Sequence, residues 1–193
     1  MACHPDFPLW NPHGFSSDTE FWEYGGSSHC LYAPCSEAEN QSPENRHILA
    51  AEAIRDRYQI PIYACQKEEK TLQDPKINLT AYHMDSYTLK ADVYLTDLQA
   101  VELAGFSVQM IETPGHTKGG VCYYLSEEGV LFSGDTLFRT SVGRTDFPTG
   151  SMSQIVRSLR YLTENLPGET VVYPGHQETT TIAYEQRFNP YLS

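Results

Sequence analysis

Three short segments of the sequence place a histidine or an aspartate directly after a glycine, where an apolar run ends. They are Thr113-Pro114-Gly115-His116-Thr117, Ser133-Gly134-Asp135-Thr136-Leu137-Phe138 and Tyr173-Pro174-Gly175-His176. A β-branched apolar run is typical of a buried strand, and a glycine lets the backbone turn sharply at its end. We therefore expect His116, Asp135 and His176 at the rim of a sheet. Zinc and iron favour imidazole and carboxylate ligands, so these segments predict a metal site.

The composition suits one domain, or one domain with a disordered piece, and excludes several classes of partner. Of the 193 residues 40% are hydrophobic, and 13 basic against 25 acidic residues give a net charge of −12. Such a field repels phosphate backbones, so we expect no nucleic-acid partner. Because no apolar run reaches 18 residues, we expect no membrane span. The N-terminus lacks the basic start and apolar stretch of a secretory signal, which favours a cytoplasmic protein.

Residues 1–46 differ in character from the rest of the chain. They contain no Val, Ile or Lys, they contain five prolines, and their aromatic residues follow no period of 2 or 3.6. We predict no helix or strand in this segment and expect disorder, followed by a folded domain over residues 47–193.

From residue 47 onward the pattern predicts alternating helices and strands. Apolar positions 50, 53, 54 and 58 predict an amphipathic helix, followed by a buried strand over 61–65, a surface helix over 66–72 and a polar loop near the site over 73–92. Strands are expected over 101–110 and in a hairpin over 121–132. Ser151 is a suitable N-cap for a helix, which a strand over 171–173 and a helix over 181–187 follow. This alternation indicates a layered α/β protein.

Two longer stretches carry a resemblance to a known family. Residues 133–150 (SGDTLFRTSVGRTDFPTG) and 173–192 (YPGHQETTTIAYEQRFNPYL) resemble the metallo-β-lactamase superfamily, and most of all its small glyoxalase II-like hydrolases. The resemblance covers about residues 47–193 and implies an αββα sandwich, in which two sheets pack face to face between helices. Because residues 1–46 carry no strand pattern, we expect the N-terminal strands to be incomplete or replaced, or the gene start to be misread.

The resemblance also implies a set of metal ligands. It assigns His116 to a first metal and His176 to a second, with Asp135 as the bridge and catalytic carboxylate. The family places a His-x-His-x-Asp-His motif at the start of an early helix. Residues 42–47 (SPENRH) stand there, so that only His47 matches. The expected metal residues are His47, His116, Asp135 and His176. The implied cofactor is one or two zinc ions, with iron or manganese as the other candidates.

The activity implied by the resemblance is hydrolysis of a small-molecule thioester, with metal-bound hydroxide as the nucleophile. The substrate stays open, because we do not expect this chain to have the helical domain with which glyoxalase II binds glutathione. One alternative is a persulfide dioxygenase-like iron oxidoreductase, whose relatives also resemble the GDTL and GRTDF stretches. The other alternative is a non-catalytic remnant of the fold, since most of the His-x-His-x-Asp-His ligands are absent.

The remaining candidate residues are predicted to be structural. The chain has five cysteines and no CxxC pair, which suits a reducing compartment, and Cys65 and Cys122 are expected in the core. Arg139, Arg144 and Asp146 are expected either to order their loop or to contact substrate, and structural salt bridges are the favoured role.

Overall fold

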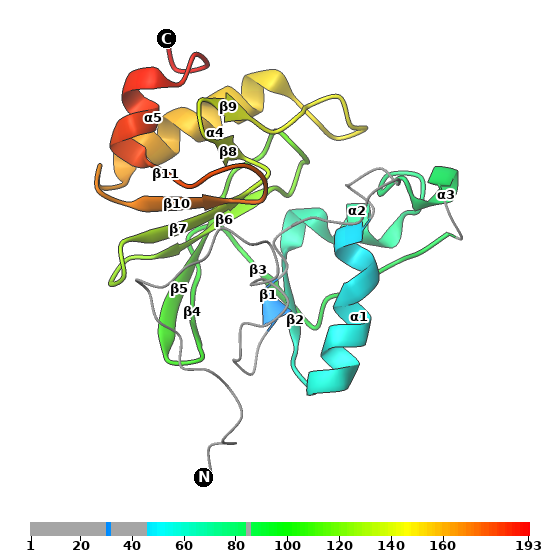
Figure 1. Cartoon of the computed structure of the whole chain (residues 1–193). Coiled ribbons are helices and arrows are strands. Elements are labelled where there is room, and N and C mark those ends of the chain that lie inside the picture. The colour runs from blue at the N-terminus through cyan, green and yellow to red at the C-terminus, as the bar shows by residue number, and fades with distance from the viewer. Residues whose placement is uncertain (1–29, 32–45, 84–85) are drawn as a thin grey trace.

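Two β-sheets lie face to face in the centre of the molecule, and helices cover the outer side of each (Figure 1). The structure, a computed structural model, describes residues 30–31, 46–83 and 86–193. Within these residues the smaller sheet is parallel and has the order β1-β2-β3 (Cys30–Leu31, Ile62–Cys65, Val93–Leu95). The larger sheet has the order β11-β10-β7-β6-β5-β4 (Thr180–Thr181, Val171–Pro174, Val130–Gly134, Val121–Leu125, Phe106–Glu112, Ala100–Leu103).

The helices are divided between the two sheets. Beside the smaller sheet lie α1 (Arg46–Tyr58), the 3-10 turn η3 (Gln66–Glu68), α2 (Glu69–Gln73) and α3 (Thr80–His83) (Figure 1). The larger sheet is covered by α4 (Met152–Asn165) and α5 (Ile182–Phe188), together with the hairpin of β8 (Leu137–Phe138) and β9 (Ser141–Val142). No helix of the described part is both long enough and apolar enough to cross a bilayer.

The core consists of three clusters, because the side chains of a strand point alternately to opposite faces. In β6, Cys122 and Tyr124 face α4 and α5, whereas Tyr123 and Leu125 face the smaller sheet. The cluster under α4 and α5 includes Ile111, Leu131, Ile155, Leu159, Leu162 and Val172. The cluster between the sheets includes Cys65, Leu95, Leu103, Val108, Met110 and Val130. The cluster under α1 and α2 includes Ala51, Ile62, Ala64, Leu72, Leu89 and Ala91. Three clusters between four layers confirm the predicted αββα sandwich.

Most predicted elements are confirmed, but several details were wrong, among them the predicted loop over 73–92, which contains the helix α3. Helix α1 is present, yet it buries Ala51, whereas Ala53 and Tyr58 of the predicted apolar face are exposed. The predicted surface helix over 66–72 is η3 and α2, and it buries Leu72 and a charged side chain, described below. The two-residue strand β1 lies inside 1–46, where no element was predicted. Such a strand is too short to carry a period, and each of its residues pairs with one 32 positions further along the chain. The other residues up to 45 lie outside the described part.

Candidate metal centre

The three segments that opened the sequence analysis meet at one edge of the larger sheet. Strand β5 is antiparallel to β6, and β6 is antiparallel to β7, so β5 and β7 point the same way. Strand β10 pairs with β7 in parallel. The carboxyl ends of these three strands therefore share an edge, and they carry His116, Asp135 and His176 in the loops that follow. The amide of Gly175 donates to the carbonyl of Gly134 at 2.9 Å, which joins two of the loops.

The Asp135 carboxylate lies between the two imidazoles. Its Oδ2 is 3.5 Å from Nε2 of His116, and its Oδ1 is 3.6 Å from Nε2 of His176. The Asp135 side chain is almost fully buried, as is that of His116, whereas about a third of the His176 side chain is exposed. One carboxylate thus presents a different oxygen to each histidine. This is the arrangement expected of a bridging ligand.

The ring of His116 has a fixed orientation. Its Nδ1 lies 2.8 Å from the carbonyl oxygen of Arg144, and the edge of its ring meets Phe147 at 4.9 Å between centroids. Since a carbonyl can only accept, Nδ1 carries the proton and donates it to Arg144, and Nε2 is the ring nitrogen that faces Asp135. Metal-binding histidines characteristically donate their other ring nitrogen to a carbonyl or carboxylate in this way.

Two glycines allow this packing. Gly115 has a φ of +146°, and a Cβ there would collide with the backbone of Ile155 in α4. A Cβ on Gly143 would collide with the carbonyl oxygen of Asp135 and would lie 3.2 Å from Nδ1 of His116. Both positions therefore need a residue without a side chain, so that helix α4 can approach the backbone before His116 and the loop after β9 can approach Asp135.

The described residues fit the chemistry of a metal centre but do not complete one. Two ligands at about 2.1 Å from one tetrahedral zinc lie about 3.4 Å apart, close to the two distances between Asp135 and the histidines. Within residues 30–31, 46–83 and 86–193, no three His, Cys, Asp or Glu side chains converge on one point as a metal site. The described residues thus form two His–Asp pairs that share Asp135. The side chain of His47, the fourth predicted ligand, lies outside the described residues.

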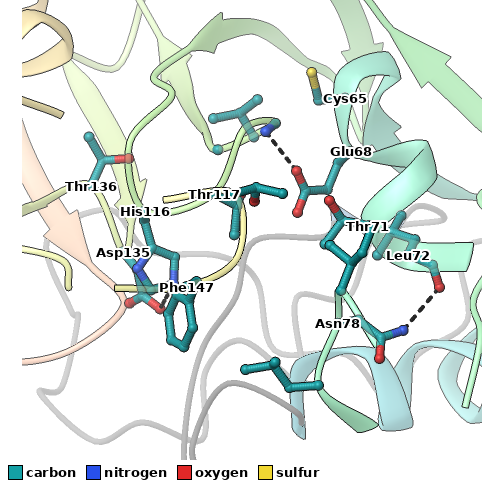
Figure 2. A pocket seen from close by; sticks show the side chains of 16 residues that line it. Cys65, Glu68, Thr71, Leu72, Asn78, His116, Thr117, Asp135, Thr136 and Phe147 are labelled. Carbon is teal, nitrogen blue, oxygen red and sulfur yellow. Dashed lines mark hydrogen bonds and ion pairs between the residues drawn. The ribbon is translucent and has the colours of Figure 1, made fainter. Parts of the chain in front are cut away.

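A pocket opens beside His116 and Asp135, between the two sheets (Figure 2). Its far wall carries Glu68, a carboxylate that is only 8% exposed. Burial raises the pKa of Glu68, and hydrogen bonds from Thr117 and Gly119 act in the opposite direction. The sequence analysis placed this residue on a surface helix. The signal that could have identified a buried partner is the pair Gly119-Gly120, since adjacent glycines after a ligand indicate a close approach by another group.

The residues predicted to be structural behave largely as expected. The guanidinium of Arg144 contacts both oxygens of Asp146 at 2.7 and 2.6 Å and lowers the pKa of that carboxyl to about 2. Arg139 instead pairs with Glu178 at 3.0 Å. Cys65 and Cys122 are buried, which raises the pKa of their thiols to about 11 and about 12 and confirms them as core residues.

Sequence comparisons link this chain to known metallo-hydrolases. A family model of the metallo-β-lactamase superfamily matches residues 47–176. A protein of Streptococcus pyogenes serotype M6 named as a probable metallo-hydrolase is 34% identical over 152 residues, which span 76% of this chain and 66% of that protein. The hydroxyacylglutathione hydrolase GloC of Haemophilus influenzae is 29% identical over 153 residues, 76% of this chain and 71% of that protein.

Solved structures agree with this assignment. The B3 metallo-β-lactamase BLEG-1 matches with a TM-score of 0.70 and 39% identity, over 76% of this chain and 72% of that chain. TTHA1623, solved in a di-iron-bound form, matches with a TM-score of 0.64 and 31% identity over the same shares. ETHE1 from Myxococcus xanthus matches with a TM-score of 0.60 and 32% identity, over 75% of this chain and 56% of that chain. On this sequence and structural likeness, the chain belongs to the metallo-β-lactamase superfamily.

Proposed function

We propose that this chain is a metal-dependent hydrolase of thioesters, of the glyoxalase II-like kind. The observation that carries the proposal is the Asp135 carboxylate, whose two oxygens face the Nε2 atoms of His116 and His176. The likeness to the hydroxyacylglutathione hydrolase GloC supports the thioester class. The pocket beside Asp135 provides a place for a small-molecule substrate.

The proposed roles follow from what each side chain can donate or accept. His116, Asp135 and His176 would hold the metal, with His47 as a further ligand. When bound, the metal would supply Lewis acidity, which lowers the pKa of coordinated water to about 7 and polarises a carbonyl. The ionised Asp135 only accepts hydrogen bonds, so it can orient an attacking water and receive its proton. Zinc is the proposed metal, and the di-iron form of TTHA1623 makes iron the other candidate.

Metal analysis combined with a thioesterase assay tests the proposal. The purified chain, loaded with zinc and dialysed, is expected to retain metal and to hydrolyse a simple thioester such as S-lactoylglutathione. Asp135→Asn, which removes the bridging charge, is expected to lose at least about tenfold in metal affinity and activity. Asp56→Asn, on the exposed side of α1, is the matched control and is expected to behave like wild type.

Three results would contradict this function. Unchanged hydrolysis by Asp135→Asn would show that the carboxylate is not in the centre. Oxygen consumption by the iron-loaded chain, without hydrolysis, would support the persulfide dioxygenase-like alternative. A folded chain that retains no metal and hydrolyses no thioester would support the non-catalytic remnant.

A further inference from the structure

Glu68 is a buried charged side chain that the proposed reaction does not use. It follows β2 in η3, on the side of the smaller sheet, and lines the pocket opposite the metal residues (Figure 2). Its Oε2 accepts the backbone N–H of Gly119 at 2.7 Å. The side chains of Thr117 and Thr71 lie beside this carboxylate and lower its pKa. One amide donor and two neighbouring hydroxyl groups therefore surround a carboxylate that is nearly closed off from solvent.

The contact between Glu68 and Gly119 depends on the size of both residues. A Cβ on Gly119 would collide with Glu68, so only glycine lets the backbone amide reach the carboxylate. A shorter side chain at position 68 would leave the Gly119 amide without its acceptor. A buried amide in that state costs about 1–3 kcal/mol.

This contact joins the smaller-sheet side to the loop that carries His116. The loop leaves β5 and returns to β6, and its base is closed by the bond from Thr113 N–H to the Gly120 carbonyl at 2.8 Å. On one flank Lys118 N–H donates to Thr149 at 3.2 Å, and the His116 ring meets the Arg144 carbonyl. Both of these partners belong to the larger-sheet half.

On the opposite flank the loop rests on Glu68. Thr117 directly follows His116 in the chain, and Gly119 lies two residues further on. When the carboxylate holds both of them, it also limits how far the backbone of His116 can move. A ligand displaced by 1 Å no longer matches the distances of a metal site, which must hold to within about 0.2 Å.

We propose that Glu68 is a positioning residue of the metal centre, which holds the His116 loop through Gly119 and Thr117 from across the pocket. This inference rests on the proposed function, because it assumes that His116 is a ligand. Glu68 itself touches neither His116 nor Asp135 in the contacts above. Its effect on metal binding is therefore carried by the loop.

The experiment uses Glu68→Ala, Glu68→Gln and the control Glu69→Ala in the full chain. Glu69 is the next residue and is exposed, so its substitution reproduces the loss of charge without the loss of the contact. Zinc affinity is measured by competition with a chelator. Exchange of the Gly119 amide is measured by NMR in the metal-free protein, where it reports on the loop independently of any activity.

We expect Glu68→Ala to weaken zinc binding at least tenfold and to speed Gly119 exchange at least tenfold. Glu68→Gln keeps one acceptor oxygen and should retain most of the zinc affinity and most of the slow Gly119 exchange. Glu69→Ala should match wild type in both measurements. Unchanged zinc affinity in Glu68→Ala, or equal losses in Glu68→Gln and Glu68→Ala, overturns the inference. If Glu68→Ala fails to fold, wild type is compared with Glu68→Gln. Slow Gly119 exchange in wild type that is at most threefold faster in Glu68→Gln supports the positioning role of Glu68. Fast Gly119 exchange in wild type overturns that role.

The failure of the proposed function gives a different pattern. If wild type binds no zinc and hydrolyses no thioester, His116 is not a working ligand, and the function fails. Gly119 exchange still shows whether Glu68 holds the loop. If zinc binds and thioesters are cleaved while Glu68→Ala leaves both unchanged, only the positioning role fails.

Discussion

The buried carboxylate of Glu185 provides the sharpest test of how α5 is held against the neighbouring loops. Glu185 is fully buried and accepts three hydrogen bonds. Its Oε1 receives the hydroxyl of Thr180 at 2.5 Å, and its Oε2 receives both the Thr140 amide and the Asn189 side chain at 2.9 Å. Thr140 has a φ of +53°, which is uncommon for a β-branched residue, so the bond to Glu185 holds a strained turn in place.

The expected cost of Glu185→Ala follows from these contacts. The amide of Thr140 and the side chain of Asn189 would each lose a buried acceptor, at about 1–3 kcal/mol apiece. Removing the buried Cγ methylene adds about 0.8 kcal/mol, and relief of the buried charge offsets part of the total. We expect a loss of about 3–5 kcal/mol in the free energy of unfolding. Glu185→Gln keeps an oxygen for both N–H donors, and the Thr180 hydroxyl can rotate to accept, so we expect a loss of about 1 kcal/mol.

Urea denaturation followed by circular dichroism measures both changes. The control is Glu164→Ala in α4, which removes an exposed glutamate and should change stability by less than about 0.5 kcal/mol. The reasoning is refuted if Glu185→Ala lies within about 1 kcal/mol of wild type. It is also refuted if Gln costs as much as Ala, because the charge rather than the acceptor geometry would then matter.

Three further perturbations probe the site and the core. Gly143→Ala should push the Asp135 backbone away and reduce zinc affinity at least about tenfold, measured against a chelator; wild-type affinity would show that the close approach is unimportant. Leu159→Ala, in the centre of the cluster under α4, should cost about 2–5 kcal/mol in urea denaturation, and a loss below about 1 kcal/mol would contradict its packing. Because burial raises the pKa of Glu68 above its ordinary 4.5, the folded state binds that proton more tightly. The free energy of unfolding of wild type relative to Glu68→Gln should therefore be highest below pH 4.5 and should fall as pH rises through the raised pKa. If this difference in stability instead increases with pH, the raised pKa of Glu68 is contradicted.

The convergence of His116, Asp135 and His176 could be predicted because each follows a strand and a glycine. Strands that run in one direction bring such residues to a common edge, and the structure places the Asp135 oxygens 3.5 and 3.6 Å from the two imidazoles. The layered architecture was predictable for the same reason: strand alternation is a local property. Whether these residues bind a metal stays a prediction.

Other features of the site cannot be predicted from a local sequence pattern. The partner of His116 Nδ1 is the backbone carbonyl of Arg144, and any residue type supplies a carbonyl. The sequence around Glu68 is typical of a surface helix, because its burial depends on a contact with Gly119, which lies 51 residues further along the chain. The buried face of α1 was misplaced because Ala51 and Ala53 have the same hydrophobicity, and only tertiary packing distinguishes them.

The two walls of the pocket come from separate stretches of the chain. Residues 65–79 form the wall beside the smaller sheet, and residues 116–149 form the wall that carries His116 and Asp135. Substitutions in the first wall can thus alter which molecule fits while the second keeps its geometry, as long as Glu68 still meets Gly119. Under the proposed function, exchanging the pocket-lining residues of this wall between relatives is expected to transfer substrate preference, provided that the core residues Cys65 and Leu72 are kept.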